Sequence, residues 1–512
     1  MFKRLFTVAF FTAISRVTGF LSNIVAAAVL GDGLISDAFW AAFRLPNSFR
    51  GIFGEGAFNA AFLPRFTRLH TQEGPEAASR FADEVYSWQI AAQLVLLVVA
   101  LAAMRYVMIA LAPGFGDHPG QLELATALAR IEFPYLIMTV SSVQLTAMLN
   151  AIQRFAAGAA WSILLNLTMI AALFAARWFP NAGYAAACGV FLGGVAQLGF
   201  ISWAAARSSL RLKIRWPRWT PEMKSFLVAL GTATVGTASV QIALFIDTMI
   251  SSVLPAGVLT SINYADRIDQ LPLGVLGLAL ATVLLPEMSR RIAQGDEAGA
   301  RSAQNRSMAI ALFLSLPFVG AFLAVPQTIM RAIFAHGHFS LAAADVSALA
   351  LAGYGVGLPA FVLVRVLTST FYSRHDTATP VRATLTAVVV NVSFKLLLVF
   401  GLNLGALGVA LGTSFGSWAN VSVLFWYGRR RKLIDIDDTL RRALLPSVVG
   451  GAATAALAVT GVYWAAALVP APGLWQRVTA LALAIALAGA GYGIVALAFR
   501  RRLPVAGMFG KR

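Results

Sequence analysis

Long apolar runs follow one another along almost the whole chain, and this feature constrains its fold more than any other. Each membrane-spanning helix needs roughly 20 apolar residues, and the 512 residues contain many such runs joined by short connections. Only 12% of the residues are charged, against about 25% in a typical soluble domain. The sequence therefore predicts an all-α polytopic membrane protein with no room for a soluble domain.

Hydropathy and loop residues together predict about 14 spans. They cover residues 7–31, 37–64, 85–112, 124–150, 158–177, 184–206, 222–253, 258–286, 307–326, 343–371, 381–401, 406–427, 443–466 and 476–499. The first run has a basic start like that of a signal peptide, but Arg16 interrupts it and no small-residue cleavage site follows, so we expect a retained span. The single cysteine, Cys188, excludes a disulfide within the chain.

Lysines and arginines gather in every second connection between the predicted spans. Examples are "PRFTRLH", "RSSLRLKIRWPRW", "YSRHDTATPVR" and "YGRRRKLIDIDDTLRR", whereas the connections near Asp117, Pro255 and Pro470 hold few basic residues. This alternation is the positive-inside pattern and predicts that both termini are cytoplasmic. The formal charge of +18 is thus explained by topology, and no nucleic-acid partner is expected.

One segment of the first half of the chain is echoed in the second half. "AFRLPNSFRGIFGEGAFNAAFLPRFTRLH" and "ADRIDQLPLGVLGLALATVLLPEMSRRI" share an arginine near the start, two Leu-Pro pairs, a glycine-containing centre and a basic turn. The second Leu-Pro pairs lie 222 residues apart. An even number of spans separates the copies, which predicts two parallel repeats around a central cavity. The expected domains are a six-helix lobe over 1–206, a cytoplasmic linker over 207–221, a six-helix lobe over 222–428 and an additional two-helix unit over 443–499.

The second predicted span contains charged residues, which are costly toward lipid and normally face water or protein. Asp37, Arg44 and Glu55 fall on nearly one face of an ideal helix. Pro46 and the nearby glycines permit a bend that would turn Arg50 toward the same face. The sequence therefore predicts a polar wall within this span.

Arginines recur in spans of both predicted lobes. A cavity with excess arginine suits a phosphate or diphosphate, because guanidinium groups bind phosphate oxygens in pairs. We expect Arg16, Arg50 and Arg267 to bind this anion, with Asp37 and Glu55 completing the site. Further candidates for the cavity or its gate are Arg44, Pro46, Gly54, Asp266, Asp269, Gln270 and Arg365. The alternative, above all for Arg44, is a buried ion pair or a side chain that extends to the cytoplasmic interface.

Four motifs resemble the MurJ/MviN family, whose members are bacterial lipid II flippases of the MATE-like multidrug/oligosaccharidyl-lipid/polysaccharide exporter superfamily. The motifs are "SRVTGF" at 15–20, "SDAFWAAFRLPNSFRGIFGEGAFNAAFLP" at 36–64, "YADRIDQLPLGVLGLALATVLLP" at 264–286 and "FYSRHDTATPV" at 371–381. The resemblance implies export of an undecaprenyl-diphosphate-linked peptidoglycan precursor across the bacterial inner membrane by alternating access. It implies a transporter rather than an enzyme, no cofactor, and cell-wall synthesis proteins and membrane lipids as partners.

The resemblance also bears on individual residues. It places the family's cavity arginines on Arg16, Arg50 and Arg267, and their acidic partners on Asp37 and Glu55. Two departures concern this site. Ser22 and Asn23 stand where the family commonly has an arginine followed by an acid, and Gln270 stands where relatives can carry an acid. Asp269, the neighbour of Gln270, could supply the acid that Gln270 lacks.

Single intramembrane charges in the predicted C-terminal lobe suggest ion coupling. Asp247 and Lys395 would either pair with each other or form a cation site with Asn391. Such a site would couple transport to an ion gradient or to the membrane potential. Convincing nucleotide-binding motifs are lacking. His336 and His338 form a His-x-His without a nearby third ligand, so loop histidines are expected rather than a metal site.

Three other functions fit parts of the sequence. A flippase for another polyprenyl-linked glycan would need the same cavity, and a MATE-like cation-coupled drug exporter would normally have fewer helices and fewer arginines. A membrane scaffold without transport activity would leave the intramembrane charges without a use. The small residues of the last two spans fit either close helix packing or a groove for a prenyl tail.

Overall fold

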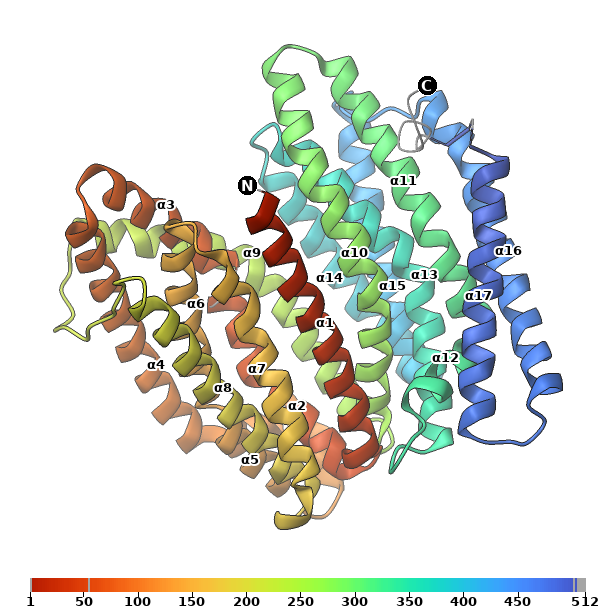
Figure 1. Cartoon of the computed structure of the whole chain (residues 1–512), viewed down its shortest axis with the longest axis horizontal. Coiled ribbons are helices and arrows are strands. Elements are labelled where there is room, and N and C mark those ends of the chain that lie inside the picture. Colours follow the sequence, from red (N-terminus) through yellow and green to blue (C-terminus); the bar gives the residue numbers. More distant parts are fainter. Residues whose placement is uncertain (1, 54–55, 501, 504–512) are drawn as a thin grey trace. The chain divides into compact units, whose positions relative to one another are not determined.

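The computed structural model describes residues 2–53, 56–500 and 502–503, and this part of the chain is almost entirely helical without a strand (Figure 1). The α-helices are α1 (Phe2–Leu30), α2 (Leu34–Phe53), α3 (Gly56–Gln72), α4 (Pro75–Leu111), α5 (Gln121–Glu132), α6 (Tyr135–Ala151), α7 (Phe155–Phe174), α8 (Ala182–Ala206), α9 (Pro221–Ser252), α10 (Val258–Ala293), α11 (Glu297–Ala324), α12 (Pro326–Phe334), α13 (Leu341–Tyr372), α14 (Ala378–Leu396), α15 (Gly405–Arg430), α16 (Asp438–Leu468) and α17 (Leu474–Ala498). Short 3-10 turns, η1 (Pro113–Asp117) and η2 (Ala176–Trp178), and a π-helical turn, η3 (Leu397–Gly401), complete the described structure.

Every predicted span overlaps one or two helices, and 11 helical segments within the described residues, with α5 and α6 counted as one, are long and apolar enough to cross a membrane. The fold is therefore the expected all-α polytopic membrane protein of about 14 spans. Three details differ from the prediction. The span expected over 124–150 is divided between α5 and α6 at Pro134, which lacks a backbone N–H, and α12 had not been predicted. The span expected over 37–64 comprises α2 and α3, which lie on either side of residues 54–55. Those two residues lie outside the described residues.

Local sequence explains where many helices begin. Asn181, Thr220, Asp296, Ser340 and Asp437 each precede a helix, and each side chain accepts a hydrogen bond from the backbone N–H three residues later. Such N-caps satisfy a backbone donor that the helix leaves without an intrahelical partner.

The helix starts display the internal repeat directly. The pairs α1 and α9, α2 and α10, α4 and α11, α5 and α13, α7 and α14, and α8 and α15 begin 219, 224, 222, 220, 223 and 223 residues apart. These values match the spacing of the Leu-Pro pairs, and the short helix α12 follows α11 as η1 follows α4. The helix order thus repeats once along the chain and is followed by α16 and α17.

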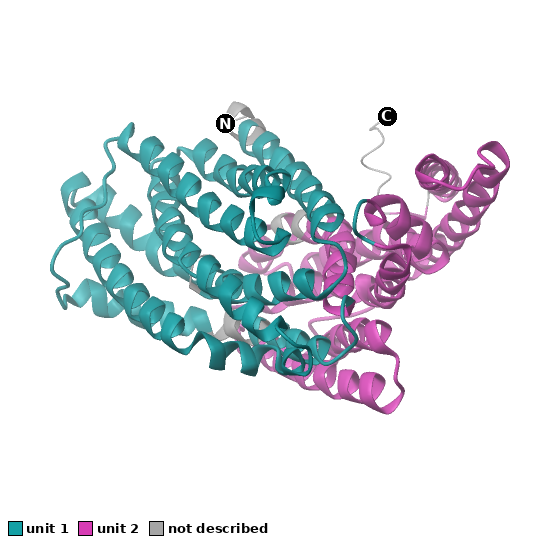
Figure 2. Cartoon of the chain, turned by 90° about the horizontal axis from the view of Figure 1, so that it is seen from below, with its two compact units in different colours: residues 1–257, 337–339 teal, residues 258–336, 340–512 magenta. Residues whose placement is uncertain are grey.

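By contacts the chain divides into two compact units, coloured separately in Figure 2. Unit 1 comprises residues 1–257 and 337–339, and unit 2 comprises 258–336 and 340–512. The sequence had assigned α9 to the second lobe, but its contacts group it with unit 1. The reason is aromatic packing: the Phe226 ring of α9 lies 5.9 Å from Phe58 and 6.2 Å from Phe81.

The predicted cytoplasmic linker is an irregular segment of unit 1 tied to α4. The buried carboxylate of Asp83 accepts hydrogen bonds from the Lys213 backbone N–H and from Arg215 Nε, both at 2.9 Å. The indole N–H of Trp88 donates to the Arg218 carbonyl at 2.9 Å. Several large apolar side chains of the linker nevertheless remain exposed, namely Ile214, Trp216 and Trp219.

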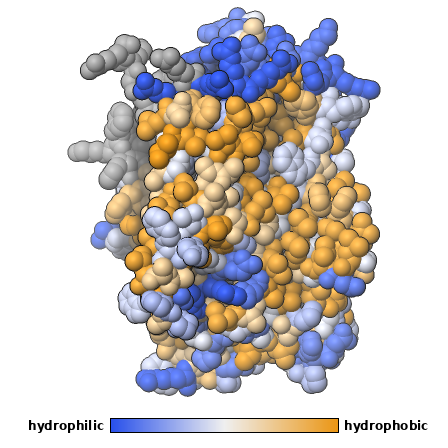
Figure 3. Space-filling view, turned by 90° about the vertical axis from the view of Figure 1, so that its right-hand side faces the viewer, coloured by the Kyte–Doolittle hydropathy of each residue, from blue (hydrophilic) through white to orange (hydrophobic). Residues whose placement is uncertain are grey.

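In unit 2, α16 and α17 pack closely on each other and on α11. A Cβ added at Gly461 would lie 2.6 Å from the Ala484 nitrogen, and one at Gly320 would lie 2.3 Å from the Gly451 carbonyl oxygen. Gly320 and Gly461 therefore serve close packing, and a groove for a prenyl tail stays a prediction. The face seen in Figure 3 has a broad apolar band between two ends at which hydrophilic side chains gather, most densely at the upper end, as expected for a surface in contact with lipid.

Candidate functional site

Helix α2 carries most of the predicted polar wall of unit 1. Asp37 lies in its first turn and is 3% exposed, and its Oδ2 accepts a hydrogen bond from the Gly257 backbone N–H at 2.7 Å. Gly257 has a φ of +88°, and a Cβ there would lie 2.0 Å from the Asp32 carbonyl oxygen. Asp37 is therefore a buried acceptor for the turn that follows α9.

The two arginines of α2 are half-buried. Arg50 donates from Nε and Nη2 to Asn47 Oδ1, one helical turn earlier, at 3.3 and 3.0 Å, which fixes the direction of its guanidinium group. Pro46 is buried inside a helix that continues beyond it. Gly54 and Glu55, two further predicted site residues, lie outside the described residues.

Arg16 is an exposed arginine within the apolar part of α1. Helix α1 packs on α7 through polar side chains: Ser15 Oγ lies 2.8 Å from Ser162 Oγ, and Asn166 Nδ2 donates to Thr18 Oγ1 at 3.1 Å. Arg16 makes no hydrogen bond or ion pair with any residue that the structure describes. Its guanidinium donors are available for a ligand.

Helix α10 carries the corresponding residues of unit 2. Asp266 and Arg267 are half-buried, Gln270 is exposed, and Gln270 Nε2 lies 3.4 Å from Asp266 Oδ1. Asp269 is 2% exposed, and its Oδ1 has no hydrogen-bond partner within the described parts of the chain. Arg365 of α13 is exposed and lies over α10, so that a Cβ at Gly277 would be 2.7 Å from the arginine Cδ.

The candidates for the anion site thus belong to different units. Arg16, Asp37, Arg44 and Arg50 are in unit 1, whereas Asp266, Arg267, Asp269, Gln270 and Arg365 are in unit 2. A common cavity for both sets stays a prediction.

The candidates for ion coupling are divided in the same way. Asp247 lies half-buried on α9 in unit 1, whereas Asn391 and Lys395 lie one turn apart on α14 in unit 2. Lys395 is fully buried, and a Cβ at Gly412 of α15 would be 2.3 Å from the lysine Cγ. The sequence had placed Asp247 and Lys395 in one lobe, so their pairing stays a prediction.

The motif "FYSRHDTATPV" forms a capped turn between α13 and α14. Asp376 accepts hydrogen bonds from the Thr379 backbone N–H at 3.0 Å, from the Thr379 hydroxyl at 2.7 Å and from Arg431. Burial alone would raise the pKa of Asp376, but these hydrogen bonds lower the pKa below its ordinary value. The motif therefore ties α14 to the end of α15.

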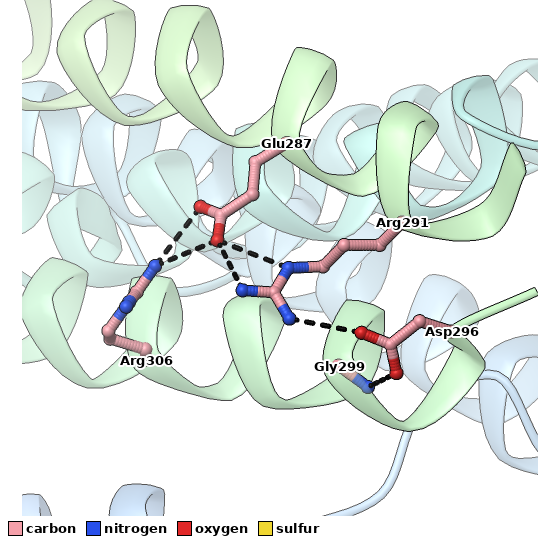
Figure 4. A network of polar contacts seen from close by, with 5 residues as sticks. All are labelled: Glu287, Arg291, Asp296, Gly299 and Arg306. Atoms are coloured by element: carbon pink, nitrogen blue, oxygen red, sulfur yellow. Dashed lines mark hydrogen bonds and ion pairs between the residues drawn. The ribbon is translucent and has the colours of Figure 1, made fainter. Parts of the chain in front are cut away.

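A second polar network fixes the turn between α10 and α11 (Figure 4). Glu287 accepts hydrogen bonds from Arg291 Nη2 and Arg306 Nη2, both at 3.0 Å. Arg291 Nη1 also donates to Asp296 Oδ2 at 3.2 Å, while Asp296 Oδ1 caps α11 through the Gly299 N–H. This network lies where the second Leu-Pro pair and its basic turn had been recognised in the sequence.

The two loop histidines bind backbone carbonyl groups. His336 Nε2 lies 2.9 Å from the Ala332 oxygen, and His338 Nδ1 lies 3.2 Å from the Ala28 oxygen. Across the described ranges, no group of three His, Cys, Asp or Glu residues lies close enough to hold a metal ion.

Glu132 is a buried acid that the sequence analysis missed. It is 0% exposed at the end of α5, and neither of its carboxylate oxygens has a hydrogen-bond partner within the described structure. Its signal in the sequence is a single acid between Ile131 and Phe133, two residues after Arg130 and before the apolar start of α6.

Comparisons with known proteins agree with this fold. A family model described as "Lipid II flippase MurJ" matches residues 26–496. A probable lipid II flippase MurJ of Rhizobium meliloti is 38% identical over 462 residues, which cover 88% of this chain and 85% of the relative. The lipid II flippase MurJ of Burkholderia cenocepacia is 32% identical over 442 residues, which cover 84% of each chain.

Two solved structures share the architecture. A lipid II flippase MurJ in an inward closed conformation has a TM-score of 0.79 at 21% identity and covers 97% of this chain and 99% of that chain. An inward-facing multidrug resistance MATE family transporter of the MOP superfamily has a TM-score of 0.69 at 18% identity, with coverages of 81% and 94%. The family model and the relatives together span most of the sequence, and the chain belongs to the MurJ family of lipid II flippases.

Proposed function

We propose that this protein moves lipid II, the undecaprenyl-diphosphate-linked peptidoglycan precursor, from the cytoplasmic to the periplasmic leaflet of a bacterial inner membrane. It is a multi-pass transporter that works by alternating access of its two repeats. Family membership over most of the chain supports the substrate, and the parallel repeats support the mechanism.

The observation that carries the proposal is the state of Arg16. The residue lies roughly 14 Å along the axis from the start of a 24-residue apolar span and roughly 21 Å from its end. An arginine at this depth is strongly unfavourable toward lipid, yet its guanidinium makes no hydrogen bond or ion pair with the described residues. A cation held so deep without a partner fits the phosphate oxygens of a passing substrate.

Arg50 and Arg267 would complete the binding of the diphosphate. Asn47 holds the Arg50 guanidinium in one direction, so less side-chain freedom is lost when an anion binds. Ser22 and Asn23 replace the charged pair common in the family, and Ser22 is buried. The clamp in this protein therefore relies on fewer cations.

We infer that both termini are cytoplasmic, since the basic connections alternate along the chain. The turns fixed by Asp376 and by Glu287, together with the linker, then lie on the cytoplasmic side. Cell-wall synthesis proteins that supply or consume lipid II are the expected partners.

We propose that an ion gradient or the membrane potential drives transport through Asp247, Asn391 and Lys395. If Asp247 and Lys395 pair, each single neutralisation leaves a buried charge, and the double variant regains stability. If Asp247 instead carries a cation, Asp247→Asn inserts normally but does not turn over, and Lys395→Met fails to rescue it. Thermal stability and flipping of the three variants decide between the two.

The function is tested by depletion of the protein in its host, followed by leaflet-resolved labelling of lipid II. We expect lipid II to accumulate in the cytoplasmic leaflet, and the wild-type gene but not Arg16→Ala to restore the periplasmic pool. Unchanged lipid II with accumulation of another polyprenyl-linked glycan would contradict the proposal. Altered drug sensitivity with normal lipid II distribution would contradict it as well.

A further inference from the structure

A pocket of about 340 Å³ opens at one end of unit 1, away from every residue assigned above to the transported substrate. Three segments form it: the start of the span of α1 at Thr7, the turn between α6 and α7, and the last turn of α8. These segments precede or follow membrane spans at the end that carries the basic connections. The pocket therefore lies at the level of the cytoplasmic lipid headgroups.

Two arginines give the pocket its charge. Arg154 belongs to the α6–α7 turn and Arg207 caps the end of α8, and both are exposed. Arg154 Nη1 donates to Ser208 Oγ at 2.8 Å, which holds the two segments together and leaves its other donors open. The lining residues include no Asp or Glu, and no ion pair recorded for the described residues involves either arginine.

The first turn of α7 adds to the positive potential. Phe155, Ala156 and Ala157 are its first three residues and line the pocket, and no side chain caps the helix. The first backbone N–H groups of this 20-residue helix, which have no intrahelical partner, thus lie at the pocket, together with the positive end of the helix dipole.

The remaining walls are apolar. Trp203 is exposed, its ring lies 4.1 Å from the Arg207 guanidinium carbon, and Leu149 and Ala157 extend the apolar lining. A tryptophan stacked with an arginine at the end of a span is typical of the membrane interface. Such walls suit the glycerol and first acyl carbons of a lipid better than a freely soluble anion.

From this combination we propose that the pocket binds the phosphate group of an anionic glycerophospholipid of the cytoplasmic leaflet. Basic pockets between transmembrane helices on that side suit such headgroups. Arg154 and Arg207 bind the phosphate oxygens, and Trp203 packs on the glycerol backbone. The pocket is too small for a disaccharide that carries a peptide, so the site is separate from the path of lipid II. The bound lipid joins the start of α1 to α7 and α8.

The test uses the purified full chain in a neutral detergent, with added phosphatidylglycerol or phosphatidylcholine. We expect phosphatidylglycerol, but not phosphatidylcholine, to raise the Tm. The double variant Arg154→Gln/Arg207→Gln should lose more than about half of that rise, because ligand-induced stabilisation falls with affinity. The matched control Arg429→Gln/Arg442→Gln removes two exposed cations from unit 2 and should keep the full rise.

A second variant separates lipid binding from folding. Ala156→Glu places a carboxylate in the first turn of α7. There the negative charge interacts favourably with the helix dipole but repels a phosphate. We expect its Tm without lipid to equal or exceed that of the wild type, and its response to phosphatidylglycerol to disappear.

Three results would overturn the proposal. One is an equal phosphatidylglycerol response in the wild type and in both pocket variants. The second is an equal response to inorganic phosphate, which would indicate a site for a free anion. The third is displacement of phosphatidylglycerol by an equimolar polyprenyl diphosphate, which would assign the pocket to the substrate. Because none of these readouts measures flipping, the outcome is independent of the proposed transport function.

Discussion

The carboxylate of Asp37 accepts a hydrogen bond from the backbone N–H of Gly257 at 2.7 Å, across 220 residues of sequence. This bond fixes the start of α2 against the turn after α9, and both partners are buried there. Gly257 also needs its left-handed φ of +88° and its missing side chain, since a Cβ would lie 2.0 Å from the Asp32 oxygen.

Loss of this bond should reduce stability in a graded way. Asp37→Asn keeps an acceptor oxygen and should change the free energy of unfolding little, whereas Asp37→Ala leaves a buried N–H unpaired, at about 1–3 kcal/mol. Gly257→Ala should be worse than either, because it adds backbone strain and a clash. Thermal unfolding in detergent checks the order, and equal Tm values for Asp37→Asn and Asp37→Ala would show that the bond contributes nothing.

Arg16→Ala should weaken binding of the diphosphate without loss of stability, because Arg16 makes no hydrogen bond or ion pair with the described residues of the protein. A lost charge-assisted hydrogen bond corresponds to about 1.5–3 kcal/mol, or roughly 10- to 100-fold in affinity. Arg16→Lys should retain part of the affinity, since it keeps the charge but not the fork. The control is Arg105→Ala, which removes only an exposed pair with Glu123 at 3.4 Å. Lipid II binding to purified variants provides the measurement, and wild-type affinity of Arg16→Ala would refute the assignment.

Gly51 lies where α2 meets α9, and a Cβ there would be 2.8 Å from Gln241 Nε2. We expect Gly51→Val to slow flipping, because the added methyl groups force the two helices apart. Gln241→Ala in the same chain should restore activity, since it removes the atom that clashes. Crosslinking between engineered cysteine pairs on a Cys188→Ala background would report the distribution of states. An unchanged distribution in Gly51→Val would show that this contact does not gate the transporter.

Two buried acids of unit 1 should respond in opposite ways to loss of their charge. Glu132→Gln should leave the Tm unchanged or raise it, because an ionised carboxylate without a partner is unfavourable in an apolar interior. Asp83→Asn should lower the Tm, since Asp83 accepts hydrogen bonds from both Lys213 and Arg215, and bonds to charged groups contribute about 1.5–3 kcal/mol. Equal losses in the two variants would show that Glu132 has a stabilising partner.

Asp376 should make stability depend on acid pH. Its folded-state pKa is lowered by Thr379 and Arg431, so its contribution is full well above the ordinary aspartate pKa of about 3.9 and is lost as the pH falls through the lower folded-state value. The Tm difference between the wild type and Asp376→Asn should therefore shrink from pH 7 to pH 3. The same Tm difference between pH 7 and pH 3 is measured for Arg331→Gln, which removes the Arg331–Asp345 ion pair, as a comparison. A difference that is constant with pH would contradict the linkage.

The sequence predicted those parts of the fold that depend on local chemistry. Apolar runs marked the spans, and the Leu-Pro pairs around Pro64 and Pro286 revealed a repeat that the helix starts then matched. What it missed depends on contacts between distant segments. The grouping of α9 with unit 1 follows from rings such as Phe226, and the partner of Asp37 is a backbone N–H in a turn. Neither leaves a pattern along the chain.

The site was predicted less completely than the fold. Residue type and depth make Arg16 a candidate whose role stays a prediction, whereas the Arg50–Asn47 hydrogen bonds depend on side-chain conformation and could not be predicted. Glu132 was missed because one acid in an apolar run has no periodicity that separates a buried side chain from an exposed one.

The linker that follows α8 has a consequence for how deep the protein sits in the bilayer. Trp216 is 87% exposed and Trp219 is 63% exposed, in a segment that also contains Arg215 and Arg218 and is held to α4 by Asp83. Tryptophan and arginine partition together to the headgroup layer. If the linker lies on the cytoplasmic side, these side chains are expected to sit in the headgroup layer and to set the depth of unit 1 in the bilayer.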